Sequence, residues 1–317
     1  MTIFVSRPIP EPAIDVLKKA GFQVEVNPED RILMADELAA HCRGKDGLLC
    51  LLTDTIDRAF LDRTPGLKGI ATMAVGYDNI DIAAAAEKGI RVSNTPGILT
   101  DATADLAWAL LLATVRRLPE ATRYLRAGEF TGWGPMLFLG GDLQDRTLGI
   151  VGAGRIGTAV ARRARGFGLS IIYADPEKNR ALEKETGARK VDFETLLKEA
   201  DFITLHVPLS EETRNLIGRR ELRLMKKTAY LINTSRGPVI DEEALAEALQ
   251  EGVIAGAGLD VYEKEPHLHP SLLSLQNVVL LPHIGSATIG TRTRMATMAA
   301  ENLVAMMRGE TAPNQVN

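Results

Sequence analysis

A short glycine-rich turn constrains the fold of this chain more than any other feature. The apolar run Leu148–Val151 leads directly into Gly152-Ala-Gly-Arg-Ile-Gly157, a G-x-G-x-x-G pattern, and a helix is predicted over Thr158–Phe167. Asp175 then stands at the end of the next predicted strand. The glycine pattern alone is a weak signal, but strand, turn, helix and acid in this order are typical of a βαβ unit that binds a dinucleotide.

Each residue of the glycine turn has a predicted task. Gly152 permits the tight turn, Gly154 lets a pyrophosphate approach the backbone, and Gly157 lets the helix pack closely on the strand. Arg155 and Ile156 lie at the N-terminus of the helix, where free N–H groups and the positive end of the helix dipole favour phosphate. The alternative is a glycine-rich turn that holds no ligand.

The acid after the second strand predicts which nicotinamide cofactor is used. The carboxylate of Asp175 can accept two hydrogen bonds from the adenosine ribose diol, and it repels a 2′-phosphate. With Pro176 directly behind it, Asp175 favours NAD(H) over NADP(H). Lys178 and Arg180 follow closely and could soften that preference.

The rest of the chain alternates short apolar runs with helical patterns, which predicts parallel sheets with helices on both faces. The fold class is therefore α/β, with two doubly wound halves, of which only the second carries the glycine turn. Strands are predicted in the first half at Thr2–Val5, Gln23–Val26, Gly47–Leu51, Gly69–Ala74 and Arg91–Ser93, and in the second at Leu148–Val151, Ser170–Tyr173, Phe202–His206, Ala229–Asn233, Ala255–Asp260 and Val278–Leu281.

Helical patterns and one irregular segment complete the organisation. A long helix, apolar almost all round, is predicted over Ala102–Arg117 and stops near Pro119. Arg126–Asp145, rich in glycine and aromatic residues, fits neither period and is predicted to be a long irregular connection. The tail, Ser286–Arg308, has an amphipathic helical pattern.

Composition excludes several classes of function. With 37 Lys and Arg against 41 Asp and Glu in 317 residues, the chain has a net charge of −4, which argues against nucleic acid as a partner. No apolar run is long enough to suggest a membrane span, and Met1–Pro10 does not resemble a signal peptide. Cys42 and Cys50 are expected to be reduced thiols, so a cytoplasmic location is predicted.

Three polar residues follow strands of the second half and suggest hydride-transfer chemistry. Arg236, Glu265 and His283 lie just beyond predicted strands, where open α/β sheets bind their ligands. The guanidinium can hold a substrate carboxylate, the imidazolium can donate a proton to a carbonyl oxygen, and the carboxylate can orient the imidazole. No metal takes part in this scheme.

Each of these residues also has a structural interpretation. Arg236 could cap a helix or pair with Asp241 or Glu242. Glu265 could be a surface residue of a turn, and His283 could be a structural loop histidine. Their joint occurrence after a nucleotide-binding pattern favours the catalytic interpretation. His267 and His269 could bind a metal adventitiously, but a solvated loop is the simpler expectation.

Nine motifs together resemble the D-isomer-specific 2-hydroxyacid dehydrogenases over essentially the whole chain, most of all the glyoxylate/hydroxypyruvate reductase branch. The motifs are Val75-Gly-Tyr-Asp-Asn-Ile-Asp81, Asn94-Thr-Pro-Gly97, Thr100-Asp-Ala-Thr-Ala-Asp105, the glycine turn, His206-Val-Pro-Leu209, Asn233-Thr-Ser-Arg-Gly237, Gly258-Leu-Asp-Val261, Glu265-Pro266 and Pro282-His-Ile-Gly-Ser-Ala-Thr288.

The resemblance implies an architecture that the residue patterns do not show. It implies a discontinuous, flavodoxin-like substrate-binding domain (residues 1–99 plus 286–317), a Rossmann domain for NAD (residues 100–285) and a cleft between them. The helices near 102–117 and 286–307 would act as hinges. Members are usually homodimers, and Trp133 resembles a residue that reaches the neighbouring subunit's active site, although a local core aromatic is equally open.

The resemblance also implies roles for individual residues. Arg236, Glu265 and His283 match the catalytic triad, and the backbone of Val75 and Gly76 matches the loop that holds the substrate carboxylate. Further cofactor contacts are implied at Thr103, His206, Val207, Pro208, Thr234, Ser235, Arg236, Asp260, His283 and Gly285.

These observations predict an NAD(H)-dependent 2-hydroxyacid dehydrogenase that reduces glyoxylate, hydroxypyruvate or similar small 2-oxo acids. An NADH-sensing binding protein on the same fold is an alternative of another class. Phosphite and 3-phosphoglycerate dehydrogenases are enzyme alternatives. Phosphite dehydrogenases carry a lysine at the position of Val75, and the chain ends at Asn317 without room for a regulatory domain.

Overall fold

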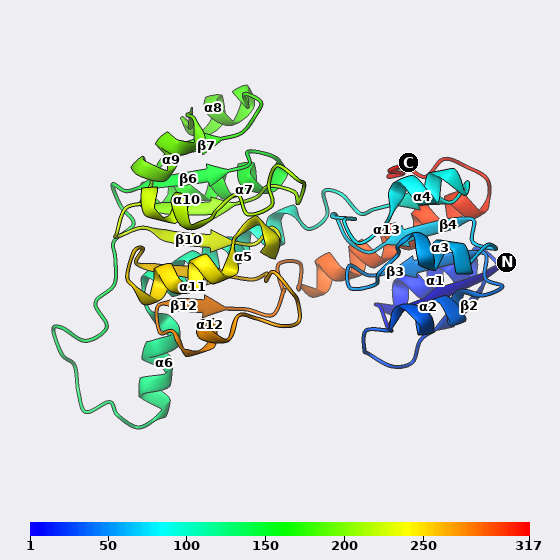
Figure 1. The fold of residues 1–317 in the computed structure, drawn as a ribbon, viewed down its shortest axis with the longest axis horizontal. Coiled ribbons are helices and arrows are strands. Elements are labelled where there is room, and N and C mark those ends of the chain that lie inside the picture. Colours follow the sequence, from blue (N-terminus) through cyan, green and yellow to red (C-terminus); the bar gives the residue numbers. More distant parts are fainter. The chain divides into compact units, whose positions relative to one another are not determined.

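A computed structural model describes all residues, 1–317, as two compact units (Figure 1). The first, here the terminal unit, combines Met1–Leu99 with Ser286–Asn317, so it contains both ends of the chain. The second, here the central unit, is the continuous segment Thr100–Gly285. Each is an α/β structure built on one parallel sheet, which confirms the predicted fold class.

The terminal unit contains a five-stranded parallel sheet in the order β2-β1-β3-β4-β5. This is the strand order of flavodoxin-like sheets, as the resemblance implies. The strands are β1 Thr2–Val5, β2 Gln23–Val26, β3 Gly47–Cys50, β4 Gly69–Thr72 and β5 Arg91–Ser93.

Helices pack on both faces of this sheet: α1 Glu11–Lys19, α2 Ala35–Cys42, α3 Arg58–Arg63, α4 Ile82–Glu87 and α13 Ile289–Met307. One core cluster joins α1 and α13 to the sheet, and another joins α2, α3 and α4 to it. Glycines in two strands make room for α13: a Cβ at Gly69 would lie 2.8 Å from the Met307 side chain, and one at Gly47 would lie 3.2 Å from Leu303.

The C-terminal tail covers the free edge of β5. Val316 N donates to Val92 O, and Asn94 N donates to Asn314 O. The Asn317 side chain accepts from Val92 N and donates to Ile90 O, each at 2.8 Å. The backbone N–H and C=O groups on the free edge of β5 are thereby hydrogen-bonded to the tail of the same unit.

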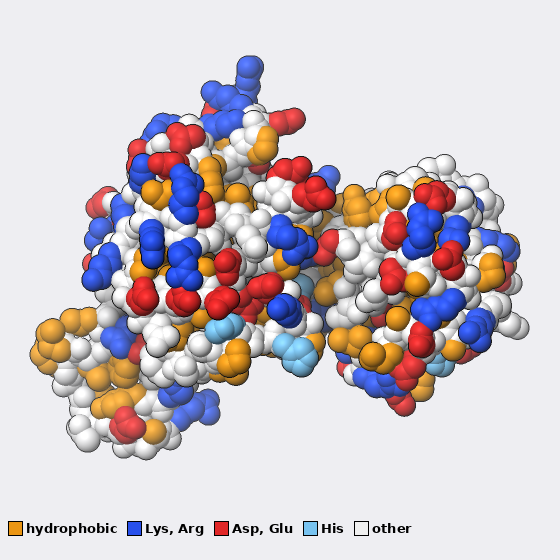
Figure 2. All heavy atoms as spheres, in the orientation of Figure 1, with side chains coloured by type: hydrophobic (Ala, Val, Ile, Leu, Met, Phe, Trp, Pro, Cys, Tyr) orange, Lys and Arg blue, Asp and Glu red, His pale blue; other side chains and the backbone are white.

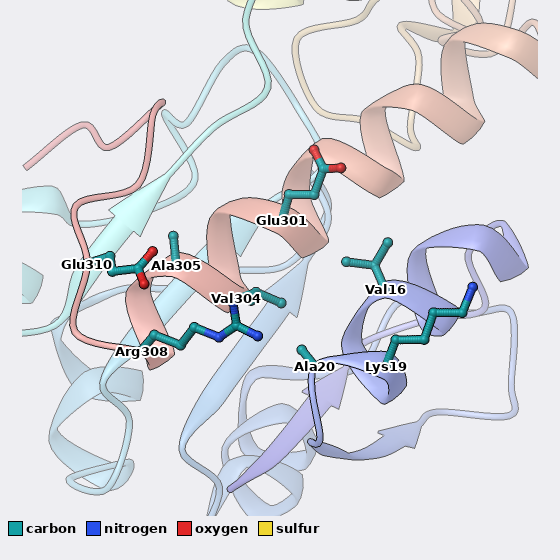
Figure 3. A pocket seen from close by; sticks show the side chains of 8 residues that line it. All are labelled: Val16, Lys19, Ala20, Glu301, Val304, Ala305, Arg308 and Glu310. Carbon is teal, nitrogen blue, oxygen red and sulfur yellow. The ribbon is translucent and has the colours of Figure 1, made fainter.

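A surface pocket of about 430 Å³ lies between α1 and α13 (Figure 3). Val16, Ala20, Val304 and Ala305 supply its apolar lining, and two basic and two acidic side chains, Lys19, Arg308, Glu301 and Glu310, complete it. None of these residues belongs to the predicted site.

The central unit contains a seven-stranded parallel sheet in the order β12-β11-β10-β9-β6-β7-β8, the Rossmann order extended by one strand. The strands are β6 Thr147–Val151, β7 Ser170–Ala174, β8 Arg189–Lys190, β9 Phe202–Leu205, β10 Tyr230–Asn233, β11 Gly256–Leu259 and β12 Val278–Leu280. The sequence predicts six of them. It misses β8, which has two residues and therefore shows no alternation.

The helices of this unit are α5 Thr100–Val115, α6 Leu118–Arg126, α7 Arg155–Ala164, α8 Arg180–Thr186, α9 Phe193–Glu199, α10 Arg219–Leu224, α11 Glu242–Gln250 and α12 Pro270–Ser274, with 3-10 turns η1 Arg165–Phe167 and η2 Gly237–Val239. The apolar helix α5 is buried in one core cluster with α7 and the sheet. The helix predicted from Thr158 begins earlier, at Arg155, directly after the glycine turn. In neither unit is a helix long and apolar enough to cross a membrane.

Pro119 begins a helix instead of ending one. The first helix ends at Val115, Arg117 adopts φ 55°, and Pro119 lies in the first turn of α6. Proline is tolerated there because the N–H it lacks has no intrahelical acceptor. The segment from Ala127 to Arg146 contains neither helix nor strand, which confirms the predicted irregular connection.

Candidate active site

The glycine turn between β6 and α7 has the geometry that a pyrophosphate needs. Gly152 has φ 91°, and a Cβ there would lie 2.8 Å from the backbone of His206. A Cβ at Gly157 would lie 2.1 Å from Gly152 O, whereas one at Gly154 would meet no atom within 4 Å. Gly152 and Gly157 are thus required by packing within the protein, and Gly154 leaves open space at the N-terminus of α7.

Asp175 lies directly beside this turn. Its Oδ2 accepts from Ala153 N at 2.8 Å, and its Oδ1 accepts from Glu177 N at 3.0 Å. The Asn179 side chain ties the same region together, because its Nδ2 donates to Ala153 O at 2.8 Å. The carboxylate is therefore held by backbone amides directly beside the glycine turn.

In the central unit, two buried polar atoms near the carboxyl ends of the strands have no partner in the protein. One is Nδ1 of His206, whose Nε2 forms a hydrogen bond with Thr204 Oγ1 at 2.9 Å, and the other is Oγ1 of Thr234. Buried polar atoms are usually satisfied. Together with the open space at Gly154, these atoms fit a polar ligand such as a dinucleotide.

His206 makes the central unit sensitive to acid. Burial lowers the pKa of its imidazole to about 3, against 6.5 for an exposed histidine. As the pH falls from about 7 to about 5, the unfolded chain takes up a proton that the folded chain does not, which lowers the free energy of unfolding by about 2 kcal/mol. Urea unfolding at both pH values measures the change in the free energy of unfolding. In His206→Gln we expect this change to be smaller by about 2 kcal/mol. His267→Gln, at an exposed histidine, is the control. An unchanged pH dependence in His206→Gln would contradict the argument.

The loop after β10 is shaped so that Arg236 is presented at the end of the strand. Asn233 donates from Nδ2 to Arg236 O at 2.9 Å, and its Oδ1 accepts from the N–H and the hydroxyl of Ser235. Gly237 then passes close to the next loop, where a Cβ would lie 1.9 Å from the backbone of Tyr262. The Arg236 loop and the Glu265 loop are thus in direct backbone contact.

His283 and Glu265 form a hydrogen-bonded pair. His283 Nδ1 lies 2.8 Å from Glu265 Oε2, and Glu265 Oε1 accepts from Tyr262 N at 3.0 Å. Burial acts to raise the pKa of Glu265, but the hydrogen bond and charge of His283, with the charge of Arg236, outweigh it and hold that pKa below its usual range. The carboxylate is thus ionised, and it fixes the ring so that Nε2 is the nitrogen left for a substrate.

Asp260 holds the loop that carries His283. This aspartate is buried at the end of β11, and its two oxygens accept from Ile284 N and Gly285 N, each at 2.7 Å. Burial raises its pKa, against the opposing effect of these amides. Thr103 Oγ1 also donates to Gly285 O at 3.3 Å. His283 has φ 53°, so the backbone is turned sharply at the histidine itself.

The remaining predicted residues have clear positions within their own units. Val75 and Gly76 lie in the turn after β4 of the terminal unit, where Asn94 Nδ2 donates to Val75 O at 2.8 Å. Val207 and Pro208 follow β9 of the central unit. His269, expected in a solvated loop, has a buried Nδ1 instead. No cluster of three His, Cys, Asp or Glu residues has the geometry to hold a metal ion.

Known proteins are similar to this chain over its full length. Residues 108–285 match the model of the NAD binding domain of D-isomer specific 2-hydroxyacid dehydrogenases. A glyoxylate reductase of Thermococcus litoralis is 53% identical over 319 aligned residues, covering 99% of this chain and 96% of that protein.

Solved structures agree with this relationship. A protein of Thermus thermophilus matches with a TM-score of 0.94 and 47% identity, each chain being covered completely. An NADPH-dependent glyoxylate/hydroxypyruvate reductase of Sinorhizobium meliloti, solved with NADP and malonate, matches with a TM-score of 0.88 and 36% identity over 99% of this chain and 96% of that one. The chain therefore belongs to the D-isomer specific 2-hydroxyacid dehydrogenase family.

Proposed function

We propose that this oxidoreductase is an NAD(H)-dependent reductase that converts glyoxylate, hydroxypyruvate or similar small 2-oxo acids into D-2-hydroxy acids. Membership of the family accounts for the general reaction and for a nicotinamide cofactor. The observation that carries the proposal is the Glu265–His283 pair, whose Oε2 and Nδ1 atoms lie 2.8 Å apart. The loop of Glu265 also contacts the loop of Arg236 directly.

The residues of the chain divide the work of the reaction. His283, held by Glu265, donates a proton from Nε2 to the carbonyl oxygen, and Arg236 binds the substrate carboxylate through its planar guanidinium. The backbone amides of Val75 and Gly76 are proposed to bind the same carboxylate. The nicotinamide, when bound, supplies the hydride. The dinucleotide that carries it is proposed to contact the glycine turn and Asp175. Further contacts are proposed at Thr103, His206, Val207, Pro208, Thr234, Ser235, Arg236, Asp260, His283 and Gly285.

A substrate panel tests this proposal. Glyoxylate, hydroxypyruvate, pyruvate and a bulky aromatic 2-oxo acid are each offered with NADH and with NADPH, and phosphite is offered with NAD in the opposite direction. We expect the highest kcat/KM with glyoxylate or hydroxypyruvate and NADH. Preference for the bulky acid would overturn the substrate class. Tight NADH binding without turnover of any 2-oxo acid would favour an NADH-sensing protein instead.

Asp175 supports NAD(H) as the preferred cofactor, although a relative uses NADPH. Because Asp175→Ala removes both the ribose acceptor and the charge that repels a 2′-phosphate, we expect the ratio of kcat/KM for NADPH to that for NADH to rise about 10- to 100-fold. Glu177→Gln removes an exposed charge two residues away and should leave the ratio unchanged. An unaltered preference in Asp175→Ala would remove this residue from the ribose site.

We infer further that the protein forms a homodimer through an arm made of α6 and the segment up to Asp145. No residue of α6 is buried. Hydrophobic side chains gather on the arm in Figure 2, among them Leu118, Leu125, Phe130, Trp133, Met136 and Leu139, each more than half exposed. Trp133 is 85% exposed, which does not fit a local core aromatic. Exposed apolar patches of this kind usually mark interfaces between proteins.

The arm can be tested separately from catalysis. Exchanging Leu125 and Trp133 together for serine removes the two large side chains, and we expect sedimentation to show the dimer of the unaltered protein shift toward monomer. Met34→Ser, at a methionine that is 70% exposed in the terminal unit, is the control. A monomeric unaltered protein, or a dimer that survives both exchanges, would contradict the interface.

A further inference from the structure

The segment that carries Glu265 has little structure of its own. Glu263–His269 is the second part of the connection between β11 and α12, and it folds into a turn in which His267 N donates to Lys264 O at 2.9 Å. Most of its side chains are exposed to solvent. The bond from Tyr262 N to Glu265 Oε1 and the packing of Leu268 against the core restrain the segment in part, and further contacts to its backbone come from another element.

Glu242 binds the backbone of this segment at both of its ends. It is the first residue of α11, and it is 7% exposed. Its Oε2 accepts from Glu263 N at 2.7 Å, and its Oε1 accepts from His269 N. One buried carboxylate therefore binds the first and the last residue of the segment, and Glu265 lies between them.

The helix that carries Glu242 does not need this side chain. Asp241 is the N-cap of α11, and its carboxylate already accepts from Ala244 N at 3.0 Å. The oxygens of Glu242 bind amides of another segment instead, and the positive end of the helix dipole stabilises their charge. Burying a carboxylate without a cation is costly unless strong hydrogen bonds compensate, so this arrangement indicates a specific task.

We propose that Glu242 is a positioning residue, which acts through the Glu263–His269 segment to keep Glu265 in hydrogen-bond contact with His283. The inference rests on the proposed function, since it assigns to Glu242 the support of the proton donor. The sequence suggests Glu242 only as a possible ion-pair partner of Arg236, because the task proposed here depends on a contact between two segments that are distant in the chain.

Few other charges surround this chain of contacts. Asp260, Arg236 and Tyr262 face the Glu265–His283 pair from the ends of β10 and β11. Around Glu242 and the segment end at His269, the titratable groups are Asp241, Glu243 and Glu247 on α11, and Tyr262 and His269 facing that helix. If Glu265 moves away, a positive charge on the His283 imidazole loses the carboxylate that stabilises it from 2.8 Å.

The decisive variant is Glu242→Gln. The amide keeps the size of the side chain, but its NH2 group faces one of the two backbone N–H donors, so one end of the segment is released. We expect kcat/KM for the 2-oxo acid to fall about tenfold at about pH 8 and by less at about pH 6, with the Kd for NADH unchanged. Glu243→Gln, at the exposed neighbour, is the matched control, and Glu242→Asp should recover part of the loss because it keeps both acceptors.

A second measurement does not depend on turnover. The His283 imidazole resonance, assigned by its absence in His283→Asn, is titrated by NMR in the unaltered protein, Glu242→Gln and Glu243→Gln. We expect its midpoint to move to lower pH only in Glu242→Gln. If Glu242→Gln differs from Glu243→Gln only in unfolding at a lower temperature, with the same pH profile of kcat/KM and the same midpoint of the His283 resonance, then Glu242 has a structural role alone and the inference is wrong. A shifted midpoint in a protein that turns over no 2-oxo acid would support the positioning and refute the proposed function.

Discussion

Replacing His283 by asparagine is expected to lower kcat about 10²- to 10⁴-fold while NADH binding is kept. Asparagine is the informative choice because His283 has φ 53°, a conformation that asparagine tolerates better than most residues. The loop itself is held by the backbone amides of Ile284 and Gly285 on Asp260, which do not involve the histidine side chain. The variant should therefore lose the proton donor and little else.

Steady-state kinetics and fluorescence titration with NADH separate these two effects. His267→Asn, at an exposed histidine of the neighbouring segment, is the control and should behave like the unaltered protein. Turnover of His283→Asn within a few-fold of the unaltered protein would show that the proton comes from another group. A variant that also fails to bind NADH would show that the histidine holds the loop.

Exchanging Arg236 for lysine is expected to lower kcat/KM for the 2-oxo acid about 100-fold or more. Lysine keeps the charge but loses the planar pair of donors that can bind both oxygens of a carboxylate. Removing one partner of a desolvated charge pair costs about 2–5 kcal/mol of binding free energy. The ammonium group of lysine would recover part of this loss toward the substrate carboxylate. The loss should appear mainly in KM for the acid, with the Kd for NADH unchanged.

The local geometry makes this exchange a clean test. Asn233 shapes the loop through the Arg236 carbonyl and through Ser235, and the arginine side chain adds a bond from Nη1 to Ser235 O at 2.9 Å, so most of the loop contacts should survive the exchange. Arg214→Lys, at an exposed arginine of the same unit, controls for a general effect of lost guanidinium groups. If Arg236→Lys retained the KM of the unaltered protein, the substrate carboxylate would have to be bound elsewhere.

The architecture could be predicted because it depends on patterns that are local in the chain. Strands such as Thr2–Val5 and Ser170–Ala174 are short apolar runs, and the glycine turn between β6 and α7 specifies a tight connection. Where the pattern was too short or ambiguous, prediction failed. The strand β8 has two residues, and Pro119 can end one helix or begin the next, which only the conformation of Arg117 decides.

The candidate site was predictable in part for the same reason. Arg236, Glu265 and His283 follow consecutive strands, and parallel strands bring their carboxyl ends to one edge of a sheet. The supporting contacts were not predictable. The sequence suggests a cofactor contact for Asp260 but not the bonds that its oxygens form with the His283 loop, and it suggests Glu242 only as a possible partner of Arg236. Both depend on how loops approach one another, which no spacing along the chain encodes.

The division of the terminal unit between the two ends of the chain has a consequence for biosynthesis. Its core unites β1 and α1, which are synthesised before the central unit, with α13, which is synthesised after it. Until α13 has left the ribosome, the apolar side chains that it covers, among them Ile3, Leu17 and Leu49, stay without their partner helix, while the continuous central unit can already fold. The nascent protein therefore carries an exposed apolar face while the central unit is being synthesised, which is the kind of surface that chaperones bind.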